Sequence, residues 1–161
     1  MKIKLFVANG ILAALYIVVS FLIQPFGFTN IQFRVSEIFN HLVVFNKRYI
    51  YGIVIGVFLT NLFFSPMMAY DLVFGVGQSV ISLIVTILVG KFVHNIWGRM
   101  AINTVVFTVS MGLIAAELHL ALHYPFALTW LTTAVGEFVV MAVGAPIMYA
   151  INKRLTFEKL V

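Results

Sequence analysis

Long runs without a charged residue dominate this chain and predict its elements. Five of the runs are about as long as a membrane-spanning α-helix, which needs roughly 20 apolar residues, and turn-forming or charged residues separate them. Pro66 and Pro125 mark two of the breaks, because proline rarely continues a helix. We expect helices over residues 5–23, 49–64, 70–91, 100–122 and 126–151.

A sixth segment, 31–46, is shorter and contains Arg34, Glu37 and His41. The basic residues decide whether it crosses the membrane, because cytoplasmic loops collect Lys and Arg. If 31–46 crosses, four basic clusters lie on one side: Lys2 and Lys4, Lys47 and Arg48, Lys91 and Arg99, and Lys153, Arg154 and Lys159. If it does not, the later clusters lie outside. We therefore predict an all-α integral membrane protein with six transmembrane helices and both termini in the cytoplasm.

Composition agrees with this pattern and excludes other classes of protein. Of the 161 residues, 63% are apolar and 9% are charged, cysteine is absent and the mean hydropathy is +1.10. Soluble domains are about 45–50% apolar and about 25% charged, and small ones bury the smallest share of their surface. A soluble enzyme, a disordered chain and a secreted disulfide scaffold are therefore excluded. We expect residues 1–161 to form a single transmembrane domain in the cell membrane.

Four of the five acidic residues fall inside the predicted spans, where a charge is costly and needs a partner or a purpose. With Arg34 they sum formally to −3; the acids are Glu37, Asp71, Glu117 and Glu137. A bound cation, protons, or a polar ligand that offers several N–H donors would stabilise so acidic a cluster.

Helical spacing places these residues on polar stripes. The stripes are Arg34, Glu37 and His41; Asp71, Gly75, Gln78 and Ser82; Asn103, Ser110 and Glu117; and Trp130, Thr133 and Glu137. Four such stripes facing one another would form a pocket open to the outside. Carboxylates and an amide between aromatic walls suit a flat, nitrogen-rich ligand. Candidate walls are Phe26, Phe28, Phe33, Tyr70 and Trp130.

Simpler interpretations compete for several of these residues. Arg34 and Glu37 could form a local ion pair, Asp71 could cap its helix, and Trp130 could belong to the interfacial aromatic belt. Glu137 is the hardest to explain in structural terms. It lies about 16 Å from the start of its helix at about 1.5 Å per residue, near the membrane midplane.

Signatures of catalysis are missing from the sequence. Gly90 and Lys91 lack the other residues of a phosphate-binding loop, so ATP is not bound in that way. His119 and His123 share a helix face, but Glu117 points to nearly the opposite side and no zinc-protease motif results. We therefore expect a protein that is not an enzyme, with no cofactor, no bound metal and no nucleic-acid partner.

Small residues four apart form two surfaces that allow close helix approach. Gly10 and Ala14 form one on the first helix, and Gly52, Gly56 and Thr60 form another on the third. The motif leaves open whether each surface packs within the bundle or against a partner.

Several strings of residues resemble the QueT family of energy-coupling factor (ECF) transporters. The most specific is 26–37, Phe-Gly-Phe-Thr-Asn-Ile-Gln-Phe-Arg-Val-Ser-Glu. The others are Ala13-Ala14-Leu15-Tyr16, Asn61-Leu62, Asp71-Leu72-Val73-Phe74-Gly75 and Val135-Gly136-Glu137. They run from the first helix to the last, so the resemblance covers essentially the whole chain.

The resemblance implies a substrate-binding (S) component with six helices in the bacterial cytoplasmic membrane. It further implies a pocket near the outer side, with the loop between the first two helices as its lid. The implied ligand is a queuosine precursor, chiefly the deazapurine 7-aminomethyl-7-deazaguanine (preQ1). Uptake would need a transmembrane coupling (T) component and two cytoplasmic ATPase subunits, and Gly10 and Ala14 match the helix face that meets the T component.

The site residues that we expect for such a ligand are Arg34, Glu37, Asp71, Gln78, Glu117, Trp130 and Glu137. One carboxylate would stabilise the protonated aminomethyl group and another would pair with the guanine-like edge. We assign the edge to Glu137 and the amine to Glu37 or Asp71.

Two other functions compete with this hypothesis. A stand-alone proton-coupled carrier or channel for a small cationic solute would use the acids as a relay. A membrane enzyme would use Glu117, His119 and His123. Uptake by vesicles without an ATPase would favour the carrier, and bound metal would favour the enzyme.

Overall fold

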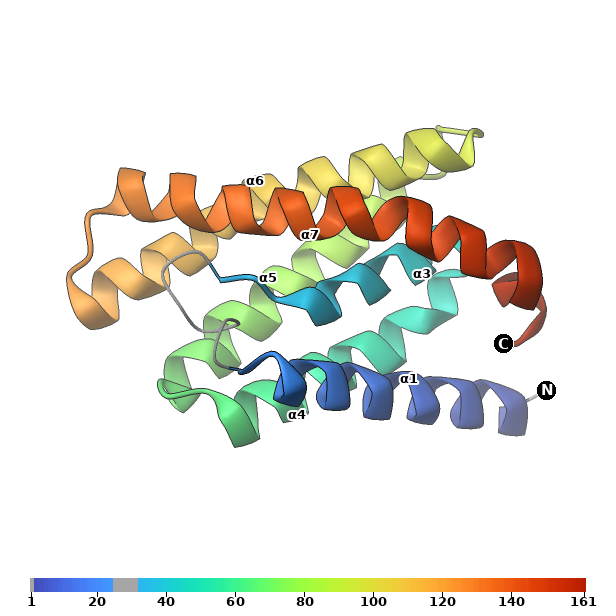
Figure 1. Cartoon of the computed structure of the whole chain (residues 1–161), viewed down its shortest axis with the longest axis horizontal. Helices are drawn as coiled ribbons and strands as arrows, with labels where there is room; N and C mark the ends of the chain where they lie inside the picture. Colours follow the sequence, from blue (N-terminus) through green and yellow to red (C-terminus); the bar gives the residue numbers. More distant parts are fainter. Residues whose placement is uncertain (1, 25–31) are drawn as a thin grey trace.

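The computed structural model describes residues 2–24 and 32–161, and these residues form a bundle of helices (Figure 1). Five long α-helices are α1 (Lys2–Leu22), α4 (Ile50–Phe64), α5 (Met68–Val89), α6 (Ile96–Leu122) and α7 (Phe126–Leu155). Short elements are η1 (Val35–His41), α3 (Leu42–Phe45), η2 (Lys47–Tyr49) and η3 (Phe157–Lys159), where η marks a 3₁₀-helix. The prediction of an all-helical membrane protein is confirmed.

Five helices in the described part of the chain are long and apolar enough to cross a membrane, the second of them counted from Lys47 to Phe64. Their outer faces carry large apolar side chains, as expected for surfaces that contact lipid. Among the most exposed are Phe6, Phe21, Phe63, Val73, Leu131 and Val135. The chain is therefore a multi-pass membrane protein.

The segment predicted as a helix over 31–46 differs from that expectation. It is a 3₁₀-helix for seven residues, η1, and an α-helix only for the four residues of α3. A 3₁₀-helix rises about 2.0 Å per residue and an α-helix about 1.5 Å, so η1 and α3 together rise about 20 Å instead of about 16 Å. The tighter winding thus lets a short segment carry the chain from one end of the bundle toward the other.

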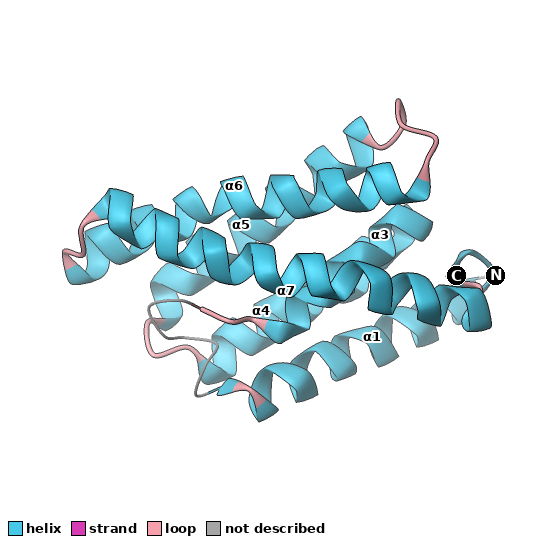
Figure 2. Ribbon diagram, turned by 45° about the horizontal axis from the view of Figure 1, so that its top comes forward, coloured by secondary structure: helices cyan, strands magenta, loops and turns pink. Residues whose placement is uncertain are grey.

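Arg34 lies just before η1, so the i, i+3, i+7 stripe that it was expected to form with Glu37 and His41 is not the face of a regular α-helix. The segment nevertheless lies at the centre of the bundle. Ile38 approaches α7 so closely that a Cβ atom at Gly144 would come within 2.7 Å of its side chain. Figure 2 shows α3 enclosed by the longer helices.

The helices α1, α4, α5, α6 and α7 pack in chain order, each against the next. The short helix η1 packs against both α1 and α7. The interface of α1 and α4 uses the small residues of α4. A Cβ atom at Gly52 would come within 2.7 Å of the Asn9 carbonyl oxygen, and one at Gly56 within 2.7 Å of Tyr16 Cβ. This small-residue surface therefore packs within the bundle.

The small-residue surface of α1 is different. Gly10 is exposed, and a Cβ atom there would have no neighbour within 4 Å among the described residues. Ala14 is exposed as well. The sequence left open whether each small-residue surface packs within the bundle. The surface on α4 does, and the surface on α1 does not.

Both ends of the described chain lie at one end of the bundle (Figure 1). The connection between α5 and α6 and the turn between α3 and α4 lie at the same end. The predicted basic clusters therefore gather there, as the charge pattern required. That this end faces the cytoplasm remains a prediction.

Candidate functional site

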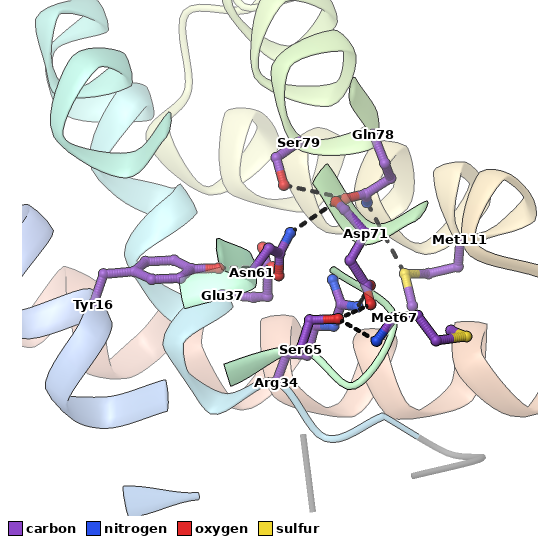
Figure 3. A network of polar contacts seen from close by, with 10 residues as sticks. All are labelled: Tyr16, Arg34, Glu37, Asn61, Ser65, Met67, Asp71, Gln78, Ser79 and Met111. Atoms are coloured by element: carbon purple, nitrogen blue, oxygen red, sulfur yellow. Dashed lines mark hydrogen bonds and ion pairs between the residues drawn. The ribbon is translucent and has the colours of Figure 1, made fainter. Parts of the chain in front are cut away.

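A buried cluster of charged side chains is contributed by η1, α5, α6 and α7 and by Arg34 just before η1. Figure 3 shows three of its members, Arg34, Glu37 and Asp71. Its acids are buried to 2% exposure or less, and Arg34 among them has 9%. Arg34 interacts electrostatically with Asp71, Glu37 and Glu117, and Glu137 interacts with Glu37 and Arg34. The structure thus brings together the four acids and the arginine that the sequence singled out.

The salt bridge of Arg34 joins two elements. Its Nη2 lies 3.4 Å from Oδ1 of Asp71 on α5, so this ion pair links the segment before η1 to α5. The Ser65 hydroxyl donates to the other oxygen of Asp71 and accepts the backbone N–H of Met67 at 2.9 Å. Asp71 therefore ties Arg34 to the turn between α4 and α5 and is not the residue that caps α5, which is Met67.

Asn61 on α4 supports the same turn. Its amide donates to the backbone carbonyl of Asp71 at 3.0 Å. This approach is possible because residue 75 is glycine, where a Cβ atom would lie 2.7 Å from Nδ2 of Asn61. Gly75, predicted as part of a polar stripe, thus contributes its lack of a side chain.

Glu37 is held by two donors. The Tyr16 hydroxyl on α1 donates to one carboxylate oxygen at 2.8 Å, and the Asn40 side-chain amide donates to the other. Hydrogen bonds from neutral groups stabilise a buried carboxylate and fix its orientation. Glu37 is therefore a positioned group with both of its oxygens satisfied.

Glu117 and Glu137 are the exception in this cluster. All four of their carboxylate oxygens are buried, and none accepts a hydrogen bond of normal geometry from a donor among residues 2–24 and 32–161, although Glu117 lies beside the Asp71 carboxyl group. Buried polar groups without partners are rare because each costs free energy. These two side chains are therefore the ones that a ligand with N–H donors would satisfy.

Next to the acidic cluster, a series of hydrogen bonds links α5 to α6, α6 to η1, and η1 to α7. The Gln78 amide donates to Ser110 Oγ at 2.8 Å, and the Thr86 hydroxyl donates to Asn103 Oδ1 at 2.9 Å. Asn103 Nδ2 lies 3.2 Å from Nδ1 of His41, whose Nε2 lies 2.9 Å from the Met141 carbonyl oxygen. The predicted stripes of α5 and α6 therefore face each other, and Gln78 links these helices.

Other residues singled out in the sequence lie elsewhere. Trp130 is 38% exposed, and its indole N–H donates to the Val109 carbonyl at 3.2 Å on the outside of α6. The structure therefore does not bring Trp130 to the acidic cluster. Tyr70 is exposed, while Phe33 lines a cavity beside Arg34. Phe26, Phe28 and the expected lid loop lie outside the described residues.

The two histidines of the enzyme hypothesis serve the end of α6. His123 is the C-cap residue with a left-handed φ of 57°, and Nδ1 of His119 lies 2.7 Å from the Tyr124 carbonyl oxygen. Both are exposed, whereas Glu117 is buried. The structure does not bring these three residues together.

Sequence reasoning missed the residues that hold the cluster in place. Tyr16, Asn40, Asn61 and Ser65 supply hydrogen bonds to Glu37 and Asp71. Two of them, Tyr16 and Asn61, lie in the strings that resemble the QueT family, and this position in the sequence could have identified them. Asn40 is a polar residue in an apolar segment, which is a second kind of signal.

The space at the cluster is small in the described conformation. The cavity beside Arg34, lined by Tyr16, Phe33 and Asn61 among others, has a volume of about 20 Å³. A cavity must offer at least about 10–15 Å³ to the centre of a water-sized sphere to hold one buried water. This cavity therefore has room for about one water molecule.

Comparisons with known proteins agree with the resemblance seen in the sequence. The family model described as "QueT transporter" matches residues 6–153. The Queuosine precursor transporter QueT of Lactococcus lactis subsp. cremoris (strain MG1363) is 33% identical, over 95% of each chain. No solved structure matches. The chain therefore belongs to the QueT transporter family.

Proposed function

We propose that this protein is the substrate-binding subunit of an ECF-type importer and that it binds a queuosine precursor, preQ1, from outside the cell. The observation that carries the proposal is the pair of buried carboxylates, Glu117 and Glu137, whose oxygens lack partners within the described residues. Membership of the QueT transporter family and the name of the Lactococcus relative support the choice of ligand.

The chemistry of preQ1 complements the cluster. Its aminomethyl group is a cation at neutral pH, and its guanine-like edge presents N–H donors in one plane. An acidic cluster with a formal charge of −3 favours a cation, and charge-assisted hydrogen bonds are roughly twice as strong as neutral ones. The ligand would therefore offset the negative charge and satisfy the orphaned oxygens together.

The hydrogen bonds refine which acid contacts which group. Glu37 and Asp71, our earlier candidates for the amine, already accept hydrogen bonds from Tyr16, Asn40 and Ser65. Glu117, close to Asp71 and Arg34, is the better candidate. We keep Glu137 for the ring edge. The roughly 20 Å³ cavity is far smaller than preQ1, so side chains around it must move when the ligand enters.

Transport would require partners. The sequence has no phosphate-binding loop, so ATP hydrolysis is assigned to two cytoplasmic ATPase subunits that act through a T component. The exposed face of α1 around Gly10 and Ala14 is the surface that we propose for the T component, because small residues let a partner helix approach closely.

Binding of preQ1 to the purified protein tests the proposal directly. Isothermal titration calorimetry in detergent should detect one site, and Glu137→Gln and Glu117→Gln should each weaken binding. A hydrogen bond to a charged group is worth about 1.5–3 kcal/mol, which corresponds to a loss of roughly ten- to hundredfold in affinity. The matched control is Glu158→Gln, which removes an exposed acid outside the cluster. Absence of binding by the unmodified protein contradicts the proposal.

Vesicles that contain only this protein separate the importer subunit from a stand-alone carrier. An S component binds preQ1 in such vesicles but does not accumulate it, even with a proton gradient. Accumulation driven by the gradient would instead support the proton-coupled carrier and would overturn the assignment to an ECF importer.

A further inference from the structure

A second pocket lies at the opposite end of the bundle from the acidic cluster, between α3, the end of α5 and the start of α6. Its volume is about 310 Å³. Three of its lining residues are cationic, Lys47, Lys91 and Arg99. Figure 1 shows the chain segments that carry them, the turn after α3 and the connection from α5 to α6, at the same end.

The charge of this pocket is not balanced by the protein. No acidic residue lines it, and none of the three cations forms an ion pair with a carboxylate in the described ranges. Three like charges around one space repel each other, and the repulsion falls when an anion enters. The pocket therefore favours a negatively charged occupant.

The rest of the lining shows what kind of anion fits. The pocket is also lined by the apolar residues Val44, Phe45 and Ile87, which we call its apolar wall. Such a surface matches a molecule with an anionic group and an apolar part. The pocket also lies where the spans end, and the stretch of chain between Lys91 and Arg99 contains the exposed aromatic residues Phe92 and Trp97, as expected at the border between hydrocarbon and headgroups.

We propose that this pocket binds the phosphate headgroup of an anionic phospholipid, with the part of the acyl chains nearest the headgroup against the apolar wall. The surrounding bilayer is the nearest source of such a molecule. Juxtamembrane Lys and Arg residues attract anionic lipids, and here the fold collects three of them around one cavity. A free phosphate ion would use the cations but not the apolar wall.

The pocket is connected to the core of the bundle by short contacts. The Arg99 guanidinium is oriented by a hydrogen bond from Nε to the Val93 carbonyl oxygen at 2.6 Å. Thr86, which also lines the pocket, donates to Asn103 in the buried chain that reaches His41. A bound lipid would therefore brace the connection between α5 and α6 and stabilise the folded bundle.

Lipid titration of the full-length protein in detergent tests this site. The probes are phosphatidylglycerol and, as the neutral comparison, phosphatidylcholine, with bound lipid counted by native mass spectrometry. The test variant is Lys47→Gln/Lys91→Gln/Arg99→Gln. The matched control, Lys4→Gln/Lys153→Gln/Arg154→Gln, removes the same charge from the same end of the bundle but outside the pocket. If the triple variant does not fold, judged by circular dichroism, Lys91→Gln alone replaces it.

We expect the unmodified protein to retain one phosphatidylglycerol in preference to phosphatidylcholine. Each cation removed from the pocket should weaken that retention about fivefold, and the control should change it less than threefold. An equal loss in the control would mean general surface attraction and overturn the proposal, as would no preference for phosphatidylglycerol. If millimolar inorganic phosphate displaces bound phosphatidylglycerol as effectively as added phosphatidylglycerol does, the occupant is a free anion and the lipid assignment is overturned.

Discussion

Glu37 and Glu137 lie in the same cluster and are equally hidden from solvent, with exposures of 2% and 1%. Tyr16 and Asn40 donate to Glu37, whereas Glu137 lacks a partner within the described part of the chain. A low-dielectric interior strengthens satisfied hydrogen bonds and makes missing ones costly. The stability of the protein should therefore respond differently to the same substitution at these two positions.

Glu37→Gln should destabilise the protein, and Glu137→Gln should not. Glutamine in place of Glu37 keeps only one acceptor oxygen for the two donors Tyr16 and Asn40, so one of them loses its partner, at a cost of about 1–3 kcal/mol. Glutamine in place of Glu137 replaces a buried carboxyl group whose oxygens lack hydrogen-bond partners among the described residues. Thermal unfolding of both variants without ligand, in the same detergent, measures the difference. Equal losses would contradict our account of which acid the protein satisfies.

Tyr16→Phe isolates one donor of the network. The ring stays in its place against α4, but the hydroxyl that lies 2.8 Å from Glu37 is removed. A buried carboxylate that loses one donor should cost about 1–3 kcal/mol of stability. Tyr51→Phe, at an exposed tyrosine on α4, is the control and should leave the melting temperature unchanged.

At the scale of the elements, close approach of helices depends on a few glycines. Gly75 gives room to Asn61, while Gly77 on the same helix has nothing near the position of a Cβ atom within the described residues. The two glycines therefore serve as a matched pair.

Gly75→Ala should push Asn61 away from the Asp71 carbonyl, loosen the turn that holds Arg34, and lower the melting temperature. Gly77→Ala should have the opposite sign, because alanine in a helix interior is up to about 1 kcal/mol more favourable than glycine. Thermal unfolding measures both. If both substitutions stabilise the protein, the contact between residue 75 and Asn61 is not a constraint.

The segment η1–α3 is the element that departs most from the sequence-based expectation. The distribution of basic residues predicts a membrane-crossing helix over 31–46, but the polar residues of η1 are buried and bonded to three other elements. Hydrogen bonds of Glu37 to α1 and of His41 to α6 and α7 reach residues far away in the chain. Such tertiary contacts override local helix propensity.

At the scale of the whole molecule, the two small-residue surfaces have different roles. The surface of α4 is covered by α1, and the surface of α1 at Gly10 and Ala14 is open. This asymmetry separates positions that maintain the fold from positions that we propose for assembly with a T component.

Gly10→Leu/Ala14→Leu should leave folding and preQ1 binding unchanged and prevent co-purification with the T component and ATPases. The added volume enters open space in the isolated protein but blocks close helix approach by a partner. Gly77→Leu is the control, because it makes the same glycine-to-leucine change at another open position. Normal assembly of the α1 variant would show that the T component binds elsewhere.

The sequence by itself determined three properties: the chain is a membrane protein, its long helices have predictable positions along the chain, and four acidic residues occupy costly positions inside the spans. These properties follow from composition and local spacing, and the acids that were singled out do converge on Arg34. Only the tertiary structure decided how each acid is satisfied, why Arg34 pairs with Asp71, and that Trp130 lies outside the cluster. The physical reason is distance along the chain. The partners of Glu37, Arg34 and His41 are separated from them by 21, 37 and up to 100 residues, and no local pattern encodes such pairs.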